Sequence, residues 1–207
     1  MAGNYFKDER PFSRLLAELA QDLPPGGITL RQLLDCLRER GLLALCMVLT
    51  LPFLLPMSIP GSSTPFGLVI ALIGLGVAAG KVPRLPGRLV DSPIAAEHLQ
   101  PVLEKGSWLF ARIERWTCKR LPLLTAGWAM ERANALIMVF SAVLLMFPLP
   151  LPLSNTLPAY GVLFLAAGSL ERDGCLVLLG YLMVLLSLSY FGLLALLGTA
   201  GVKALFA

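Results

Sequence analysis

Six hydroxyl and amide side chains lie at corresponding places in two proline-rich stretches of the sequence. They are Ser62, Ser63, Thr64, Ser154, Asn155 and Thr156. Because apolar sequence surrounds them, these groups could offer oxygen atoms and polar hydrogens to a polar solute or ion. The alternative is that they only cap neighbouring helices, since Ser, Thr and Asn are preferred capping residues.

A second set of candidates consists of charged residues at the borders of the apolar runs. They are Glu39, Arg40, Glu131, Arg132, Glu171, Arg172 and Asp173. The first four could pair with one another, and the last three could relay a proton or cation. The alternatives are that the first four only mark the membrane interface and that the last three form a solvated turn.

The sequence contains few residues that are suited to catalysis or metal binding. His98 is the single histidine, and the four cysteines have no CxxC spacing. We expect buried free thiols at Cys36, Cys46, Cys118 and Cys175. The sequence therefore predicts no catalytic residue, no metal site, no cofactor and no enzymatic activity.

The proline-rich stretches belong to an internal repeat. Pro56–Thr64 corresponds to Pro148–Thr156 at an offset of 92 residues, and from Phe66 onward the offset becomes 94. The shared glycines are Gly67 with Gly161, Gly74 with Gly168, and Gly80 with Gly174. Apolar segments that are interrupted by Gly and Pro at matching places in two halves indicate a transporter-type site. A duplicated hairpin that only anchors the chain is the alternative.

Composition indicates a membrane protein. Of the 207 residues 57% are hydrophobic and 14% charged, against about 25% charged in soluble domains. The net charge of +4 arises in residues 81–132, which carry nine basic and five acidic residues. This segment is expected to be cytoplasmic and to face anionic lipid headgroups. Nucleic acid is not an expected partner.

The elements that position these residues follow from hydrophobic periodicity. Residues 1–40 predict two amphipathic helices, the second beginning at a capping box made by Thr29 and Gln32. The remaining segments of a single membrane domain are hairpin repeat 1 (41–80), a basic amphipathic connector (81–132), hairpin repeat 2 (133–174) and a transmembrane helix (175–200).

Two features of these segments stay open at this point. The connector could lie in the membrane interface, with Trp108, Trp116 and Trp128 at headgroup depth, or pack on the hairpins of the protein itself. The hairpin segments are of a length between a thin tilted span and a re-entrant loop. If both hairpins return to the side they entered, the two repeats are parallel.

Three motifs carry a resemblance to a known family. They are Pro56 to Thr64 with Pro60-Gly-Ser-Ser-Thr64 at its end, Leu153-Ser-Asn155-Thr-Leu-Pro158, and Leu170-Glu-Arg-Asp-Gly174. Over roughly residues 12–200 the chain resembles the ExoD family of bacterial exopolysaccharide synthesis proteins. The resemblance implies a bacterial inner-membrane protein linked to exopolysaccharide production and, in some members, to alkaline tolerance. It implies no reaction and no catalytic residues.

The sequence thus predicts an all-α, polytopic membrane protein with two Pro-broken helical hairpins, a C-terminal transmembrane helix and amphipathic interfacial helices. The expected function is transport, or support of transport, of a polar solute or ion in exopolysaccharide production. A non-transporting scaffold for polysaccharide synthesis enzymes is the alternative, and an enzyme acting on lipid-linked sugars is disfavoured. Expected partners are the lipid bilayer, polysaccharide synthesis or export proteins, and further copies of the chain.

Overall fold

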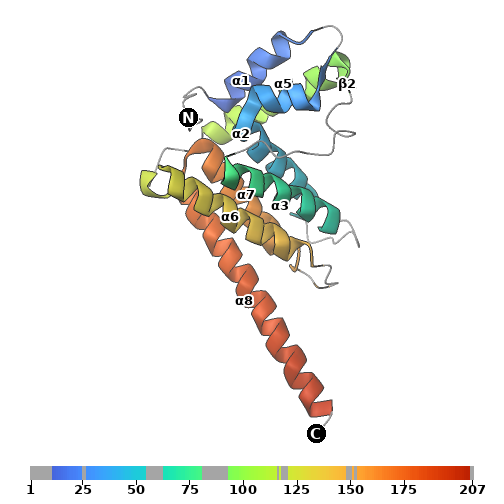
Figure 1. The fold of residues 1–207 in the computed structure, drawn as a ribbon, viewed down its shortest axis with the longest axis vertical. Helices are drawn as coiled ribbons and strands as arrows, with labels where there is room; N and C mark the ends of the chain where they lie inside the picture. Colours follow the sequence, from blue (N-terminus) through green and yellow to red (C-terminus); the bar gives the residue numbers. More distant parts are fainter. Residues whose placement is uncertain are drawn as a thin grey trace. The chain divides into compact units, whose positions relative to one another are not determined.

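The computed structural model describes residues 11–24, 27–54, 63–80, 93–115, 117, 121–147, 151 and 153–205. In this part of the chain the fold is helical (Figure 1). The α-helices are α1 (Phe12–Gln21), α2 (Leu30–Thr50), α3 (Ser63–Ala79), α5 (Ala96–Glu114), α6 (Trp128–Leu145), α7 (Thr156–Glu171) and α8 (Gly174–Leu205). Two 3₁₀ turns, η1 (Leu51–Phe53) and η2 (Pro122–Leu124), and a two-residue pairing of β1 (Ile28–Thr29) with β2 (Pro93–Ile94) complete it. The all-α prediction is confirmed.

The chain forms two compact units. The first comprises residues 1–41 and 84–118, and the second residues 42–83 and 119–207. Helix α2 begins in the first unit and ends in the second, so it continues without interruption past the border predicted at residue 41. The predicted division of one membrane domain into five segments stays a prediction.

In the first unit α1 packs against α5 through apolar side chains. Phe12 is fully buried, and its ring meets the ring of Phe110 edge-on at 4.8 Å between centroids. The backbone N–H and the hydroxyl of Ser13 both donate to the Glu114 carboxylate, at 2.9 and 2.5 Å. The apolar stripe predicted for the connector is therefore partly covered by α1.

The start of α2 confirms the predicted capping box. The Thr29 N–H donates to the Gln32 side chain at 2.9 Å, and the Gln32 N–H donates to the Thr29 hydroxyl at 3.2 Å. This reciprocal pair satisfies two backbone donors that a helix start leaves without acceptors. The same Thr29 lies in β1, which pairs antiparallel with β2.

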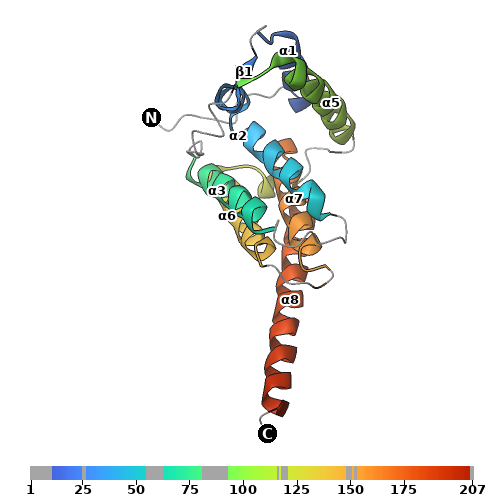
Figure 2. The ribbon, with the colours of Figure 1, turned by 90° about the vertical axis from the view of Figure 1, so that its right-hand side faces the viewer.

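The second unit is a bundle in which α3 packs on α6, α6 on α7, and α7 on α8 (Figures 1 and 2). Glycines of the proposed repeat lie at these crossings. A Cβ on Gly74 would lie 2.6 Å from Val139 of α6, and one on Gly168 would lie 2.7 Å from the Val177 backbone of α8. These positions need glycine because a neighbouring helix approaches the backbone closely.

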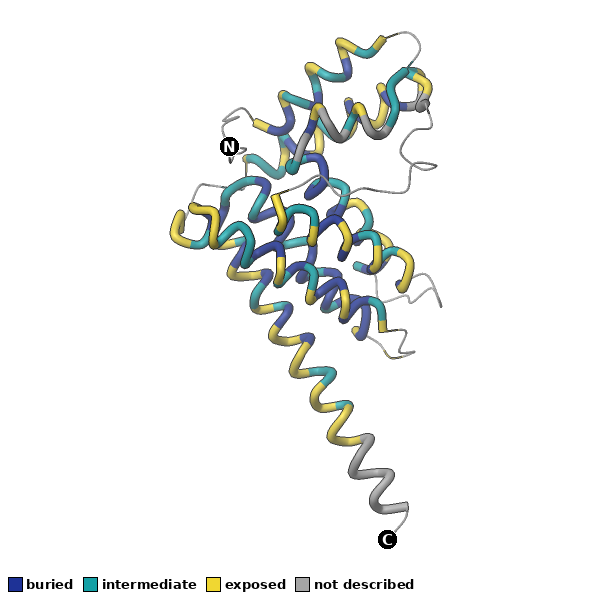
Figure 3. The backbone as a smooth tube through the Cα atoms, viewed as in Figure 1, coloured by how far each residue is buried: buried dark blue, intermediate teal, exposed yellow. Residues whose placement is uncertain are grey.

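Helix α8 continues past the ends of α6 and α7 (Figures 1 and 2). Beyond the bundle its described surface is largely exposed (Figure 3), with leucines Leu193, Leu196 and Leu197 at 56, 69 and 61% exposure. In the described residues, α6 and the Gly174–Leu197 part of α8 are long and apolar enough to cross a membrane, and α3 is a shorter apolar helix. This agrees with a membrane protein and with the predicted C-terminal span.

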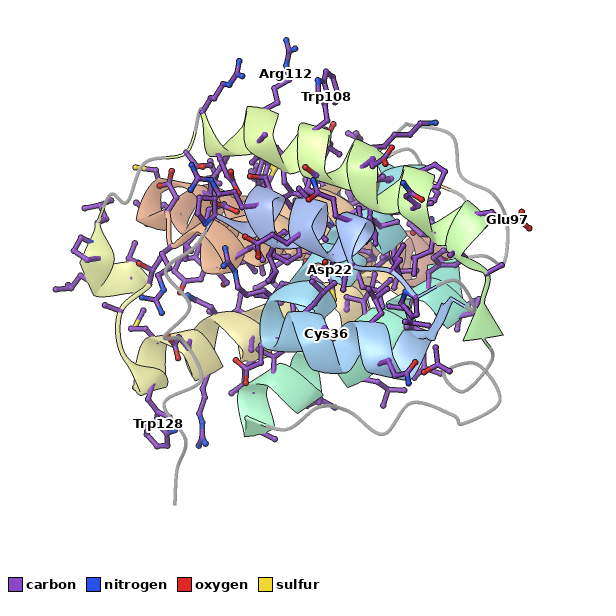
Figure 4. All side chains as sticks on the ribbon, turned by 90° about the horizontal axis from the view of Figure 1, so that it is seen from above. Asp22, Cys36, Glu97, Trp108, Arg112 and Trp128 are labelled. Atoms are coloured by element: carbon purple, nitrogen blue, oxygen red, sulfur yellow. The ribbon has the colours of Figure 1, made fainter. Side chains whose placement is uncertain are left out.

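The thiols differ from the prediction. Cys46 is buried, but Cys36 and Cys175 are exposed, and all three are free. Cys36 lies on the exposed side of α2 (Figure 4), and Cys175 lies in the first turn of α8, where neighbouring helices leave the helix surface open. Cys118 lies outside the described residues.

Candidate functional site

The flanks of the two proline-rich stretches come together in the second unit. The Thr64 hydroxyl, in the first turn of α3, donates to the backbone carbonyl of Met146 at the end of α6, at 3.2 Å. Turn η1, which precedes the first stretch, contacts α7, which follows the second. Residues that are about 80 positions apart in the sequence therefore meet at one end of the bundle, which we call the tip end.

Polar side chains at the start of α7 are buried at this tip end. Ser154 is fully buried, and Asn155 and Thr156 are each 8% exposed. The Ser154 hydroxyl donates to the Leu151 carbonyl at 2.8 Å. No described residue provides a hydrogen-bond donor for the side-chain oxygen of Asn155, Oδ1.

The six predicted polar residues are accounted for as follows. Ser63 is buried as the first residue of α3, Thr64 is exposed next to it, and Ser154, Asn155 and Thr156 are buried around the start of α7. Ser62 lies outside the described residues. Ser63 and Thr156 begin helices and Asn155 precedes one, and the capping alternative stays a prediction. Nevertheless, the Asn155 side chain makes no capping hydrogen bond.

The charged residues before each apolar run lie in different units. The Arg40 guanidinium lies over the Phe12 ring at 5.3 Å, and Arg132 lies over the Trp128 ring at 4.1 Å. Both distances allow cation–π attraction. Burial raises the pKa of Glu39 above its ordinary value. Pairing of Glu39 and Arg40 with Glu131 and Arg132 stays a prediction.

The turn Glu171–Asp173 links α7 to α8 at the end of the bundle opposite the tips. Arg172 adopts a left-handed conformation with φ 54°, and Asp173 is only 5% exposed. The Asp173 carboxylate accepts from the Cys175 N–H at 2.9 Å and so caps α8, where the helix dipole favours a negative charge. The 16 residues of α7 separate this turn from the tip end by about 24 Å. Acids in this turn do not touch the tips.

Two buried polar links were not singled out from the sequence. Asn134 is 2% exposed, donates to the Leu124 carbonyl at 2.9 Å and accepts from the Tyr181 hydroxyl, so it ties α6 to η2 and α8. Ser141 donates to the Pro158 carbonyl at 2.9 Å and joins α6 to the first turn of α7. Both lie in the uncharged run that begins at residue 133, and a polar side chain within an apolar run was the available signal.

The exposed face of α5 carries a second set of candidate contacts. Trp108 is 65% exposed, and the Arg112 guanidinium lies 5.9 Å from its ring. Both side chains point away from α1 (Figure 4). Trp128, at the start of α6, is also exposed. Exposed Trp next to Arg is the composition of a membrane-interface helix.

The tip end offers neutral polar chemistry. The sequence carries no charged residue from 41 to 80 or from 133 to 170. In the described residues no group of three His, Cys, Asp or Glu side chains could hold a metal ion. The groups available at the tips are hydroxyls, an amide and helix ends, which can bind a solute through hydrogen bonds or an ion through oxygen atoms.

Comparisons with known proteins point to one family. The family model described as "Exopolysaccharide synthesis, ExoD" matches residues 12–193. The chain is 44% identical to "Protein ExoD" of Rhizobium meliloti (strain 1021) over 195 residues, which cover 94% of this chain and 81% of that protein. It is 29% identical to an uncharacterized protein of Synechocystis sp. over 168 residues, 76% of this chain and 77% of that protein. No solved structure matches the chain.

Proposed function

The chain belongs to the ExoD family of exopolysaccharide synthesis proteins, and we propose that within this process it passes, or supports the passage of, a polar solute or ion along its two tips. In this proposal the protein is a multi-pass protein of the bacterial inner membrane. The residues that would line the passage are Ser62, Ser63, Thr64, Ser154, Asn155 and Thr156. The family assignment supports a role in exopolysaccharide synthesis. The polar groups at the tip end support the proposed passage of a solute or ion.

The hydrogen bond between Thr64 and Met146 is the observation on which the mechanism depends. Broken helices can pass a solute only if their freed backbone groups and polar side chains gather in one place. A link between the start of α3 and the end of α6 supports such a gathering. Buried Ser154, Asn155 and Thr156 contribute the polar groups on the α7 side.

Helix α8 supports a position of the tips inside the hydrocarbon. The rings of Phe147, next to the second tip, and Phe191 of α8 are 6.2 Å apart, which fixes the level of the tips along α8. The apolar segment of α8 extends to Leu197, which is about 9 Å beyond Phe191. Exposed leucines there are compatible with surrounding hydrocarbon, which supports a bilayer that extends past the tips.

The short bundle helices support hairpins that return to the side they entered. Helix α6 is long enough to cross a membrane, but α3 and α7 have 17 and 16 residues and are therefore about 24–26 Å long. A hydrocarbon core of about 30 Å is slightly longer than this. In this arrangement α8 is the segment that crosses completely, and the basic segment 81–132 stays on the cytoplasmic side.

Single-cysteine labelling tests whether the tips are accessible to water. The chain would first have Cys36, Cys46, Cys118 and Cys175 replaced by serine or alanine, and T64C or F147C would then be introduced. In intact proteoliposomes we expect both thiols to react with a membrane-impermeant maleimide from at least one side. L196C, on the apolar extension of α8, is the matched control and should stay unreactive. If T64C and F147C are as unreactive as L196C, the passage does not exist.

A functional readout complements the labelling. In cells that depend on this chain for exopolysaccharide, T64A, N155A and T156A should lower the secreted amount while the protein level in the membrane stays unchanged. T199A is a control, because Thr199 is a hydroxyl residue near the C-terminal end of α8 rather than at the tips. Unchanged secretion in all three tip variants would contradict the proposal.

A non-transporting scaffold for polysaccharide synthesis enzymes is the second candidate. The exposed leucines of α8, such as Leu185 at 60% and Leu196 at 69%, favour it, because they could contact helices of a partner or a second copy as well as lipid. A scaffold would depend on these leucines and not on the tips. Secretion that is lost in L185N and retained in T64A, N155A and T156A would favour the scaffold.

A further inference from the structure

Asn155 holds a buried polar atom that the described protein does not use. The residue precedes α7 directly and is 8% exposed, and no described residue donates a hydrogen bond to its Oδ1 atom. A buried amide oxygen without a donor lowers stability, since its hydrogen bonds to water are lost on folding. Such a group is rare in native proteins and requires an explanation.

The local sequence explains why Oδ1 finds no donor in its own helix. An Asn at this position normally accepts from the N–H of the second or third helical residue. The third residue is Pro158, which has no N–H. The second is Leu157, whose N–H already donates to the Leu153 carbonyl at 3.1 Å. The usual capping role of the Asn155 side chain is therefore blocked by its neighbours.

The surroundings favour a neutral ligand. No charged residue lies in the two sequence runs that form the tips, so a charged ligand would meet no compensating charge there. A ligand hydroxyl fits this environment, because it is neutral and can donate a hydrogen bond to Oδ1.

We propose that Asn155 is a binding residue for a neutral polyhydroxylated ligand of the saccharide class, one hydroxyl of which donates to its side-chain oxygen. The proposal rests on the function assigned above to the tips and names the chemical class of the solute. Asn155 is then kept at a cost to the stability of the ligand-free protein, because its oxygen serves the ligand and not the fold.

The pair N155L and N134L separates this role from a structural one. Both change a buried Asn to a side chain of similar size. Asn134 has hydrogen-bond partners at both ends, Leu124 and Tyr181, so N134L should lower the thermal unfolding midpoint of the full chain in detergent. N155L should leave that midpoint unchanged or raise it. A midpoint lowered by N155L as much as by N134L would mean that Oδ1 has a partner within the protein and would overturn the proposal.

Binding is measured with defined probes on the same purified chain. Radiolabelled cellobiose is the saccharide probe, and sodium and potassium chloride test the alternative of an alkali cation. We expect saturable cellobiose binding by the unaltered chain and a loss of about tenfold in affinity in N155L. No cellobiose binding, equal binding by N155L, or a response to the salts alone would each overturn the proposal.

The two proposals fail in different ways. If T64C and F147C are labelled but N155L binds cellobiose as the unaltered chain does, the proposal of a passage is supported and the proposal that Asn155 binds a saccharide is contradicted. If neither position is labelled and N155L still loses cellobiose binding, the protein binds a saccharide without transporting it. Only the proposal of a passage is then contradicted.

Discussion

The hydroxyl of Thr64 and the backbone carbonyl of Met146 are joined by a hydrogen bond of 3.2 Å, although the two residues lie 82 positions apart. This bond connects the start of the helix after the first proline-rich stretch to the end of the helix before the second. It brings together the two halves in which the same pattern of Pro, Ser, Thr and Gly occurs.

Removing this hydroxyl should loosen the tip end. T64V keeps the shape of the side chain and loses the donor, so we expect the free energy of unfolding to fall by about 1 kcal/mol. T64S keeps the donor and should stay within a few tenths of a kcal/mol of the unaltered chain, with the midpoint in detergent as the measurement. Equal midpoints for T64V and T64S would show that the bond contributes nothing measurable.

Gly161 should not tolerate a methyl group. A Cβ there would lie 2.6 Å from the Ser141 hydroxyl and 3.0 Å from Val184, so G161A should lower the thermal midpoint. S141A removes the nearest atom and should recover part of the loss in the double variant. G192A is the matched control, because nothing lies within 4 Å of that position and Ala favours a helix by up to about 1 kcal/mol. A midpoint that rises in G161A as in G192A would contradict the close approach of α6 and α7.

Because of Glu39, the free energy of unfolding should fall as the pH rises. Burial raises its pKa in the folded protein, so the protonated form is favoured by folding. Its stabilising contribution is complete below the unfolded pKa and is lost as pH rises through the raised folded pKa. E39Q, which cannot ionise, should be more stable than the unaltered chain above this window and should show a weaker pH dependence. Identical profiles for E39Q and the unaltered chain would refute the effect.

Trp108 should lie at headgroup depth. A variant with Trp116 and Trp128 changed to Phe keeps Trp108 as the single fluorophore, and lipids brominated near the headgroup should quench it more than lipids brominated near the chain end. R112Q should weaken this quenching in anionic vesicles, since the cation next to the ring is lost. Quenching by aqueous iodide that is equal with and without vesicles would place Trp108 in water.

The sequence predicted best where one local signal decides the structure. Periodicity gave α1, an uncharged run gave α8, and the spacing of Thr29 and Gln32 gave the start of α2. Helix α2 continues past the predicted segment border at residue 41, because a change from charged to apolar side chains does not interrupt backbone hydrogen bonds. The β1–β2 pairing was missed because two residues are too few to show alternation.

Tertiary relationships were harder to predict. A repeat suggests that each half packs on itself, yet α3 packs on α6, and nothing in α3 alone specifies that partner. The polar tip residues were found because they recur, whereas Asn134 and Ser141 occur once and were overlooked. Asn155 makes no capping bond because Pro158 has no N–H and the N–H of Leu157 already donates to Leu153. The second of these causes is seen only in the structure.

The pairing of α3 with α6 also bears on how the chain is made. Trp128, where α6 begins, follows Ala79, where α3 ends, by 49 residues, so during synthesis α3 emerges well before its packing partner exists. In water the apolar face of α3, not yet covered by α6, would favour aggregation. In the proposed multi-pass arrangement α3 would instead lie among lipid tails, which are as apolar as leucine, so its uncovered face would cost little until α6 is inserted.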